Sequence, residues 1–101
     1  MILYKAVDVE LKSLGLKRAI PIQYKIGEWV YPREEPQGGQ YKPGGLWVAK
    51  NKSFIHWIKK YMREKHNREA FIYTCEIGNV LWESRNRIKT DKVKLLWKVV
   101  K

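Results

Sequence analysis

One segment of helical periodicity, residues 51–66, lies among segments in which apolar and polar residues alternate. At 100° per residue, its apolar side chains fall on one arc and its polar side chains on the opposite arc. Asn51 or Ser53 can cap its start. We therefore predict an amphipathic helix that ends near His66 and packs its apolar arc on a sheet. That arc consists of Phe54, Ile55, Trp57, Ile58, Tyr61 and Met62.

Strand-like alternation occurs on both sides of this helix. The segment 70–82 is predicted as a long strand or a hairpin, because Gly78-Asn79 can serve as a turn or a bulge. A second segment is broken or bulged at Gly27. The predicted fold class is α+β, a mostly antiparallel sheet packed by one main amphipathic helix. Its strands are expected in residues 2–12, 20–31, 46–48, 70–82 and 92–99.

The chain of 101 residues fits a single domain, residues 1–101. Residues 19–31 align with residues 70–82 at a spacing of 51, with three identities in thirteen positions. Two interpretations are open: related half-motifs in 1–50 and 51–101, or two glycine-interrupted strands that look alike by physics alone. So few identities favour the second. If the halves are related, a groove between them is a natural partner site.

Several classes of protein are excluded by simple features of the chain. No apolar run approaches the roughly 20 residues that span a bilayer, so no membrane partner is expected. The first residues lack the basic flank and apolar stretch of a signal peptide. The single cysteine, Cys75, cannot form an internal disulfide or a multi-cysteine metal site. We expect an intracellular protein.

The residues that carry catalytic chemistry do not form a catalytic pattern. Cys75 lies mid-strand among apolar neighbours, which is typical of a core thiol. His56 and His66 are ten residues apart with no carboxylate at ligand spacing, so no metal site is predicted. The doubled glycines at 38–39 and 44–45 precede a strand, whereas a phosphate cradle precedes a helix. We predict a binding protein that is not an enzyme and has no cofactor.

The net charge of +11 suggests a polyanionic partner. Residues 1–50 carry eight basic and five acidic side chains, and residues 51–101 carry thirteen and five. The second half is therefore predicted to bind nucleic acid, through the polar helix arc and the Arg85–Lys89 loop. A solvated basic stripe is the alternative interpretation. The predicted contacts are His56, Lys59, Lys60, Arg63, Arg85, Arg87 and Lys89.

A proline- and glycine-rich loop, residues 32–45, supports a second hypothesis, a protein–protein interaction module. The loop is longer than most connections, and such loops are often functional. Gln40, Tyr41 and Lys42 are its predicted partner residues. The module would take a peptide or host factor in a groove or at a sheet edge. An acidic protein is the expected partner, and a homodimer is left open.

Short motifs resemble a family of small, mostly phage-encoded proteins of uncharacterised function. The similar segments are Tyr4-Lys5-Ala6-Val7-Asp8, Gly15-Leu16, Tyr24-Lys25-Ile26-Gly27 and Gly45-Leu46-Trp47. The chain departs from the family at Trp47 and Ala49, where the family has His and Cys. The resemblance implies a viral protein in the host cytoplasm. Abundant Lys and Glu with scarce Cys and Met suit a thermophilic host.

The order strand, glycine-containing strand, helix, strand is also similar to a reduced ADP-ribosyltransferase-like layout. The catalytic glutamate and the nicotinamide-clamping arginine of that family have no secure match in this chain. This similarity implies a third hypothesis, a degenerate ADP-ribosyltransferase-like domain, on fold analogy alone.

Overall fold

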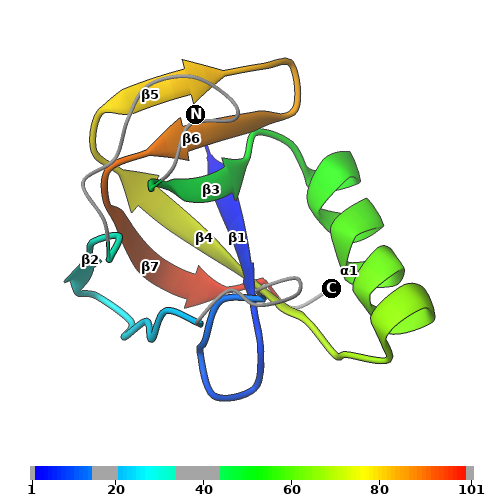
Figure 1. Ribbon diagram of the computed structural model, residues 1–101. Helices are drawn as coiled ribbons and strands as arrows, with labels where there is room; N and C mark the ends of the chain where they lie inside the picture. Colours follow the sequence, from blue (N-terminus) through cyan, green and yellow to red (C-terminus); the bar gives the residue numbers. More distant parts are fainter. Residues whose placement is uncertain (1, 15–20, 34–43, 100–101) are drawn as a thin grey trace.

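The computed structural model describes residues 2–14, 21–33 and 44–99. The described residues form seven strands and one helix that packs against the sheet (Figure 1), which confirms the predicted α+β class. The elements are β1 (Leu3–Val7), β2 (Trp29–Val30), β3 (Leu46–Ala49), α1 (Lys52–His66), β4 (Phe71–Ile77), β5 (Val80–Glu83), β6 (Arg87–Thr90) and β7 (Val93–Lys98).

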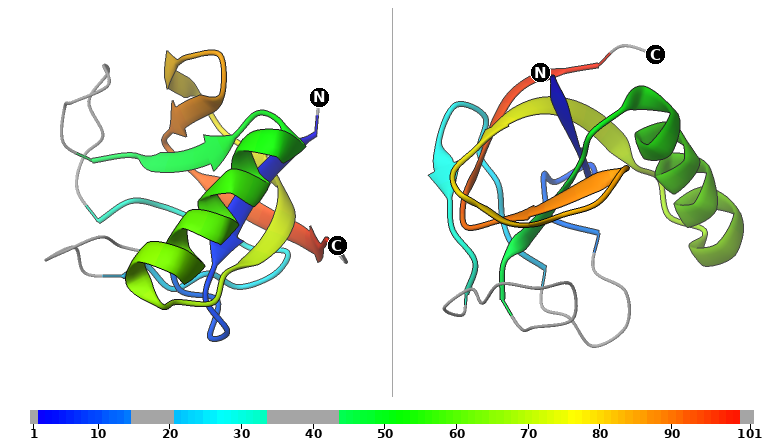
Figure 2. Two further views of the ribbon diagram at one scale, coloured as in Figure 1. Left: turned by 90° about the vertical axis from the view of Figure 1, so that its right-hand side faces the viewer. Right: turned by 90° about the horizontal axis from the view of Figure 1, so that it is seen from above.

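The strands form one sheet in the order β2-β7-β4-β1-β3-β6-β5, and every neighbouring pair is antiparallel. β4 pairs with β7, and β5 pairs with β6. The chain from β4 to β5 is therefore one long, bent strand, and the chain from β6 to β7 is its bent partner. The sheet curls around itself, as Figure 2 shows from above.

The chain bends at residues 78–79, where the sequence predicted a turn or a bulge. The predicted alternative of a hairpin between β4 and β5 is wrong, because the two strands are not neighbours in the sheet. A Cβ on Gly78 would lie 2.3 Å from Asp91 Oδ1, so this corner requires glycine. Asn79 donates to the Asp91 carboxylate from its backbone N–H at 2.8 Å and from Nδ2 at 2.9 Å. Burial acts to raise the pKa of Asp91, but these hydrogen bonds outweigh it and lower the pKa.

Two apolar clusters lie on opposite faces of the sheet. In β1, alternation directs Leu3 and Val7 to the inner face of the curled sheet, and Tyr4 and Ala6 to the face beneath α1. The inner cluster also contains Cys75, which confirms the predicted core thiol.

Helix α1 begins and ends close to the predicted residues. The Asn51 side-chain oxygen accepts a hydrogen bond from the Phe54 N–H at 2.8 Å, so Asn51 is the cap. Ile55 and Met62 are buried against the sheet, as expected. Trp57 is 57% exposed, however, so the predicted apolar arc is wider than the sheet covers.

The first predicted strand, residues 2–12, is too long, because β1 ends at Val7. Asp8 begins a turn there, and its Oδ1 accepts the N–H groups of Glu10 at 2.8 Å and Lys12 at 2.9 Å. A side chain that bonds nearby backbone offers the chain an alternative to the sheet ladder.

The second predicted strand, residues 20–31, is also wrong for most of its described part. Only β2 is a strand. Outside it, Gln23 makes an isolated bridge to Lys12, and Ile26 makes one to Leu95 of β7. Tyr24 is buried, but Ile26 is 51% exposed, so the two do not share a buried face. Residues 70–82, which resemble this segment in sequence, instead form a bent strand.

The predicted partner residues Gln40, Tyr41 and Lys42 lie outside the described residues. In the described part of the chain, no helix is both long and apolar enough to cross a membrane.

Candidate functional site

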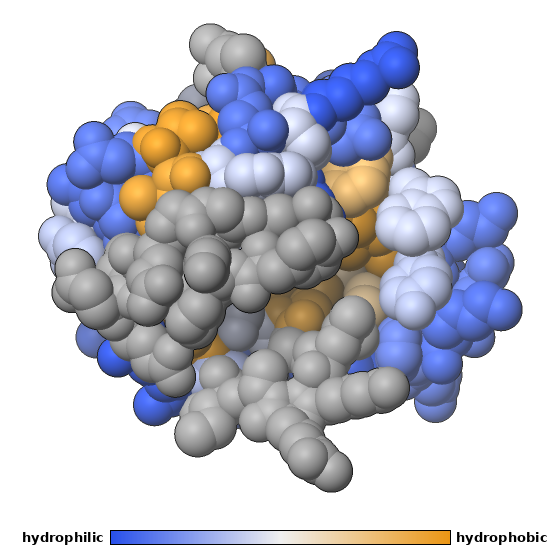
Figure 3. All heavy atoms as spheres, turned by 45° about the horizontal axis from the view of Figure 1, so that its top comes forward, coloured by the Kyte–Doolittle hydropathy of each residue, from blue (hydrophilic) through white to orange (hydrophobic). Residues whose placement is uncertain are grey.

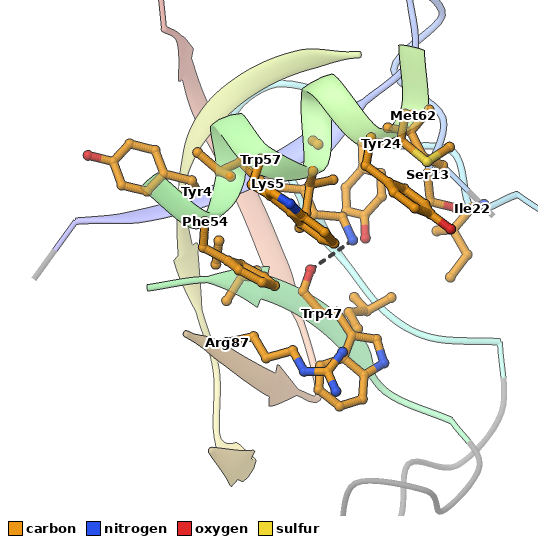
Figure 4. A pocket seen from close by; sticks show the side chains of 18 of the residues that line it. Tyr4, Lys5, Ser13, Ile22, Tyr24, Trp47, Phe54, Trp57, Met62 and Arg87 are labelled. Carbon is orange, nitrogen blue, oxygen red and sulfur yellow. Dashed lines mark hydrogen bonds between the residues drawn. The ribbon is translucent and has the colours of Figure 1, made fainter. Parts of the chain in front are cut away.

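A gap opens in the sheet where β1 and β3 diverge. These strands pair only at Tyr4 and Ala49. The same register would place Ala6 opposite Trp47, but the Lys5 ammonium reaches across and donates to the Trp47 carbonyl at 2.9 Å (Figure 4). A side chain thus bridges the strands where the ladder has ended.

A cavity of about 580 Å³ lies over this gap, between α1 and β3. Figure 3 shows a hollow with an apolar interior beside the helix. The side of the helix that points away from the hollow is strongly hydrophilic. The cavity falls in the size range of small-ligand pockets, about 300–1,000 Å³. Its helix wall consists of Phe54, Ile55, Trp57, Ile58, Tyr61 and Met62.

Three aromatic rings form a row along the helix wall. The ring centroids of Phe54 and Trp57 are 6.0 Å apart at an interplanar angle of 18°. Those of Trp57 and Tyr61 are 5.4 Å apart at 20°. Helical spacings of three and four residues place the rings on one side of α1. The cavity is therefore bordered by near-parallel aromatic planes.

A cation lies at the opposite side of the cavity. The Arg87 guanidinium lies 4.6 Å from the Trp47 ring centroid and 5.7 Å from that of Trp82. The two indoles meet edge to face at 5.6 Å. Cation–π attraction holds the guanidinium in this position, as Figure 4 shows for Arg87 and Trp47.

Lys5 and Tyr24 lie on the inner side of the cavity. Lys5 Nζ is 5.5 Å from the Tyr24 ring centroid. Burial lowers the pKa of Lys5 to about 8, although Cys75 opposes this shift, so the amine is mostly protonated at neutral pH. Burial raises the pKa of Tyr24. The Tyr24 hydroxyl is buried and has no hydrogen-bond partner among the described residues.

The predicted basic residues of the helix do not face this cavity. Arg63 follows Phe54 by nine residues, which places it on the opposite side of the helix. Lys59 and Arg63 border a second, smaller hollow of about 410 Å³. The structure therefore separates the predicted basic stripe, His56, Lys59, Lys60 and Arg63, from the aromatic row.

The other predicted contacts do not form one surface either. Arg85 is exposed in the turn between β5 and β6, and Arg87 borders the cavity. Lys89 is fully buried. A Cβ on Gly45 would lie 2.6 Å from Lys89 Cε, and Gly45 has a φ of +87°, so both space and backbone require glycine there.

Sequence reasoning missed Lys5, Tyr24 and Trp47. The alternation of β1 carried a signal for Lys5, because this residue lies between Leu3 and Val7 on the inner face. Nothing in the sequence indicated that β1 and β3 would diverge and leave the lysine beside a cavity.

No group of three or more His, Cys, Asp or Glu side chains within residues 2–14, 21–33 and 44–99 could hold a metal ion. The chain matches no protein-family model, no curated protein and no solved structure.

Proposed function

We propose that the protein binds single-stranded nucleic acid in the cavity between α1 and β3. The observation that carries this proposal is the row of Phe54, Trp57 and Tyr61 beside the cavity, with Arg87 across from it. Aromatic planes that stack bases, combined with cations that meet phosphates, are the usual elements of single-strand binding.

The charge of the chain supports the same proposal. The net charge of +11 attracts polyanions from a distance. Lys65 is exposed and follows Tyr61 by four residues, so it lies on the aromatic side of the helix. Arg87 and Lys65 can neutralise phosphates on either side of a strand whose bases enter the cavity.

A single strand fits this site better than a duplex. In a duplex the base faces are covered by their neighbours, and the exterior presents phosphates and groove edges. An apolar, aromatic-lined hollow offers little to such a surface. Unstacked bases can instead insert and cover the apolar walls.

The test compares labelled single-stranded and duplex oligonucleotides of one sequence by fluorescence anisotropy over a range of salt concentrations. We expect tighter binding of the single strand and a log–log salt slope set by the phosphates contacted, about −0.7 for each. Equal binding of both forms would indicate a purely electrostatic contact. Absence of binding at low salt would reject the proposal.

A protein-interaction module is the second candidate, and the sheet edges favour it. Among the described strands, β2 and β5 end the sheet, and Val80 of β5 is 50% exposed. An added strand from a partner could pair with such an edge. Strand-swapped or peptide-bound protein that persists after nuclease treatment would favour this function. The degenerate transferase stays a prediction, which titration with nicotinamide adenine dinucleotide in a calorimeter would test.

A further inference from the structure

The inner side of the cavity contains two hydrogen-bond donors, the half-buried Lys5 and the buried Tyr24. Lys5 Nζ uses one N–H on the Trp47 carbonyl and retains others. Tyr24 is fully buried, and its hydroxyl has no partner among the described residues. A buried hydroxyl without a partner costs free energy and calls for a ligand, an ion or a water.

Carboxylate side chains that could accept from these donors are absent from the described lining of the cavity, which includes no Asp or Glu. The Ser13 hydroxyl oxygen already accepts the Ile22 N–H at 2.8 Å, and the Trp47 carbonyl already accepts from Lys5. The cavity therefore suits a flat, apolar ligand that carries a hydrogen-bond acceptor.

We propose that this part of the cavity binds a ring carbonyl oxygen and so selects keto bases, uracil, thymine or guanine, over the amino bases cytosine and adenine. The inference rests on the proposed binding of single-stranded nucleic acid. Lys5 and Tyr24 are its specificity-determining residues, and the aromatic row supplies stacking that any base can use.

The direction of entry explains the selectivity. A base attached to its strand enters a cavity with the edge farthest from its sugar. That edge carries a carbonyl acceptor in uracil, thymine and guanine, but an amino donor in cytosine and adenine. An amino group would meet the Lys5 ammonium donor against donor. The Tyr24 hydroxyl could then only accept from the amino group, which would leave its own O–H without an acceptor.

The experiment measures affinities for oligo(dU) and oligo(dC) of equal length, because the edges of these bases far from the sugar differ in a carbonyl against an amino group. We expect oligo(dU) to bind about five- to a hundredfold more tightly, the range that one good base contact supplies. The Tyr24→Phe variant keeps the ring and removes the hydroxyl. It should weaken oligo(dU) binding more than oligo(dC) binding and so reduce the preference.

Two controls separate specificity from folding. Tyr31→Phe removes the hydroxyl of an exposed tyrosine after β2 and should change neither affinity. Lys5→Met removes the second donor and should also reduce the preference. The melting temperature of Tyr24→Phe should equal or exceed that of the parent, because the variant removes an unpartnered buried group.

The outcomes distinguish this inference from the proposed function. Binding of both oligonucleotides with equal affinity overturns the inference and leaves the proposed function standing. Absence of binding to either overturns both. A preference for oligo(dU) that survives both Tyr24→Phe and Lys5→Met overturns the assignment of these residues.

Discussion

Helix α1 exposes one aromatic side and one cationic side, and the two have different surroundings. The aromatic side, with Trp57 and Tyr61, borders the cavity over the gap between β1 and β3. The cationic side, with Lys60 and Arg63, is exposed, and Arg63 borders the smaller hollow. Both sides are equally visible in the sequence, but only one of them faces a concave, apolar site.

The difference shows why charge alone is a weak indicator of a binding site. An exposed lysine on a helix is stable in water and needs no partner. An exposed tryptophan that borders an apolar cavity leaves apolar surface in water. Contiguous exposed apolar surface marks interaction sites, so we propose the aromatic side as the binding surface.

The largest expected effect separates the buried face of α1 from its aromatic side. Ile55→Ala should lower the free energy of unfolding by about 2–5 kcal/mol, because it leaves a cavity under the helix. Trp57→Ala should cost much less stability, because Trp57 is 57% exposed. Chemical denaturation measures both. Equal losses of free energy of unfolding would mean that Trp57 contributes as much to the stability of the fold as the buried Ile55.

Binding should respond in the opposite way. Trp57→Ala should lower the affinity for a single-stranded oligonucleotide by about 1–3 kcal/mol, the value of one stacked base. Lys60→Gln, on the cationic side, is the matched control and should change the affinity little at moderate salt. Anisotropy titrations measure both variants. A larger loss for Lys60→Gln than for Trp57→Ala would move the interface to the cationic side.

The salt dependence sharpens the same comparison. Each phosphate contact on a single strand contributes about 0.7 to the slope of log affinity against log salt. Arg87→Gln should reduce the slope by about that amount. Replacing Lys59, Lys60 and Arg63 together by Gln should leave the slope nearly unchanged. A reduction of about 2 in the triple variant would show that the cationic side contacts the strand.

The smallest expected effect concerns pH. On the cavity side, Lys5 is half-buried and partly desolvated, whereas the cations on the other side of α1 are exposed. The pKa of Lys5 is lowered from 10.5 to about 8, so above pH 8 the unfolded chain binds a proton that the folded chain has lost. Stability therefore rises with pH from about 8. The pKa of Cys75 is raised by burial from 9.0 to about 12, and that of Tyr24 is also raised. Above about pH 9, both groups lower the stability as pH rises, because the folded chain keeps protons that the unfolded chain loses.

Denaturation at pH 7, 8 and 9 tests this expectation. The parent should become more stable between about pH 8 and 9, and Lys5→Met should lose that increase. A parent whose stability is constant over this interval would contradict the burial of the Lys5 ammonium. Lys5→Met therefore tests the environment of the Lys5 amine beside the cavity in the absence of any ligand.

Local patterns predicted those elements whose shape depends on neighbours in the sequence. Asn51, one of the two predicted caps, caps α1, and Ile55 and Met62 are buried as the periodicity requires. The Asp8 turn was missed, because a side chain that bonds its own backbone competed with the alternating pattern. The binding contacts were predicted from charge, and Lys89, fully buried beside Gly45, shows that charge does not report exposure.

The sequence by itself determined that one amphipathic helix covers a mostly antiparallel sheet, because periods of 3.6 and 2 fix which side chains share a face. Only the tertiary structure decided that β1 and β3 diverge after Tyr4, that Lys5 bridges the gap, and that Tyr24 lies beside it. The physical reason is that strand divergence and the bend at Gly78 depend on the packing of residues distant in the chain. Periodicity describes a face of one element, whereas a cavity is the space that several elements leave between them.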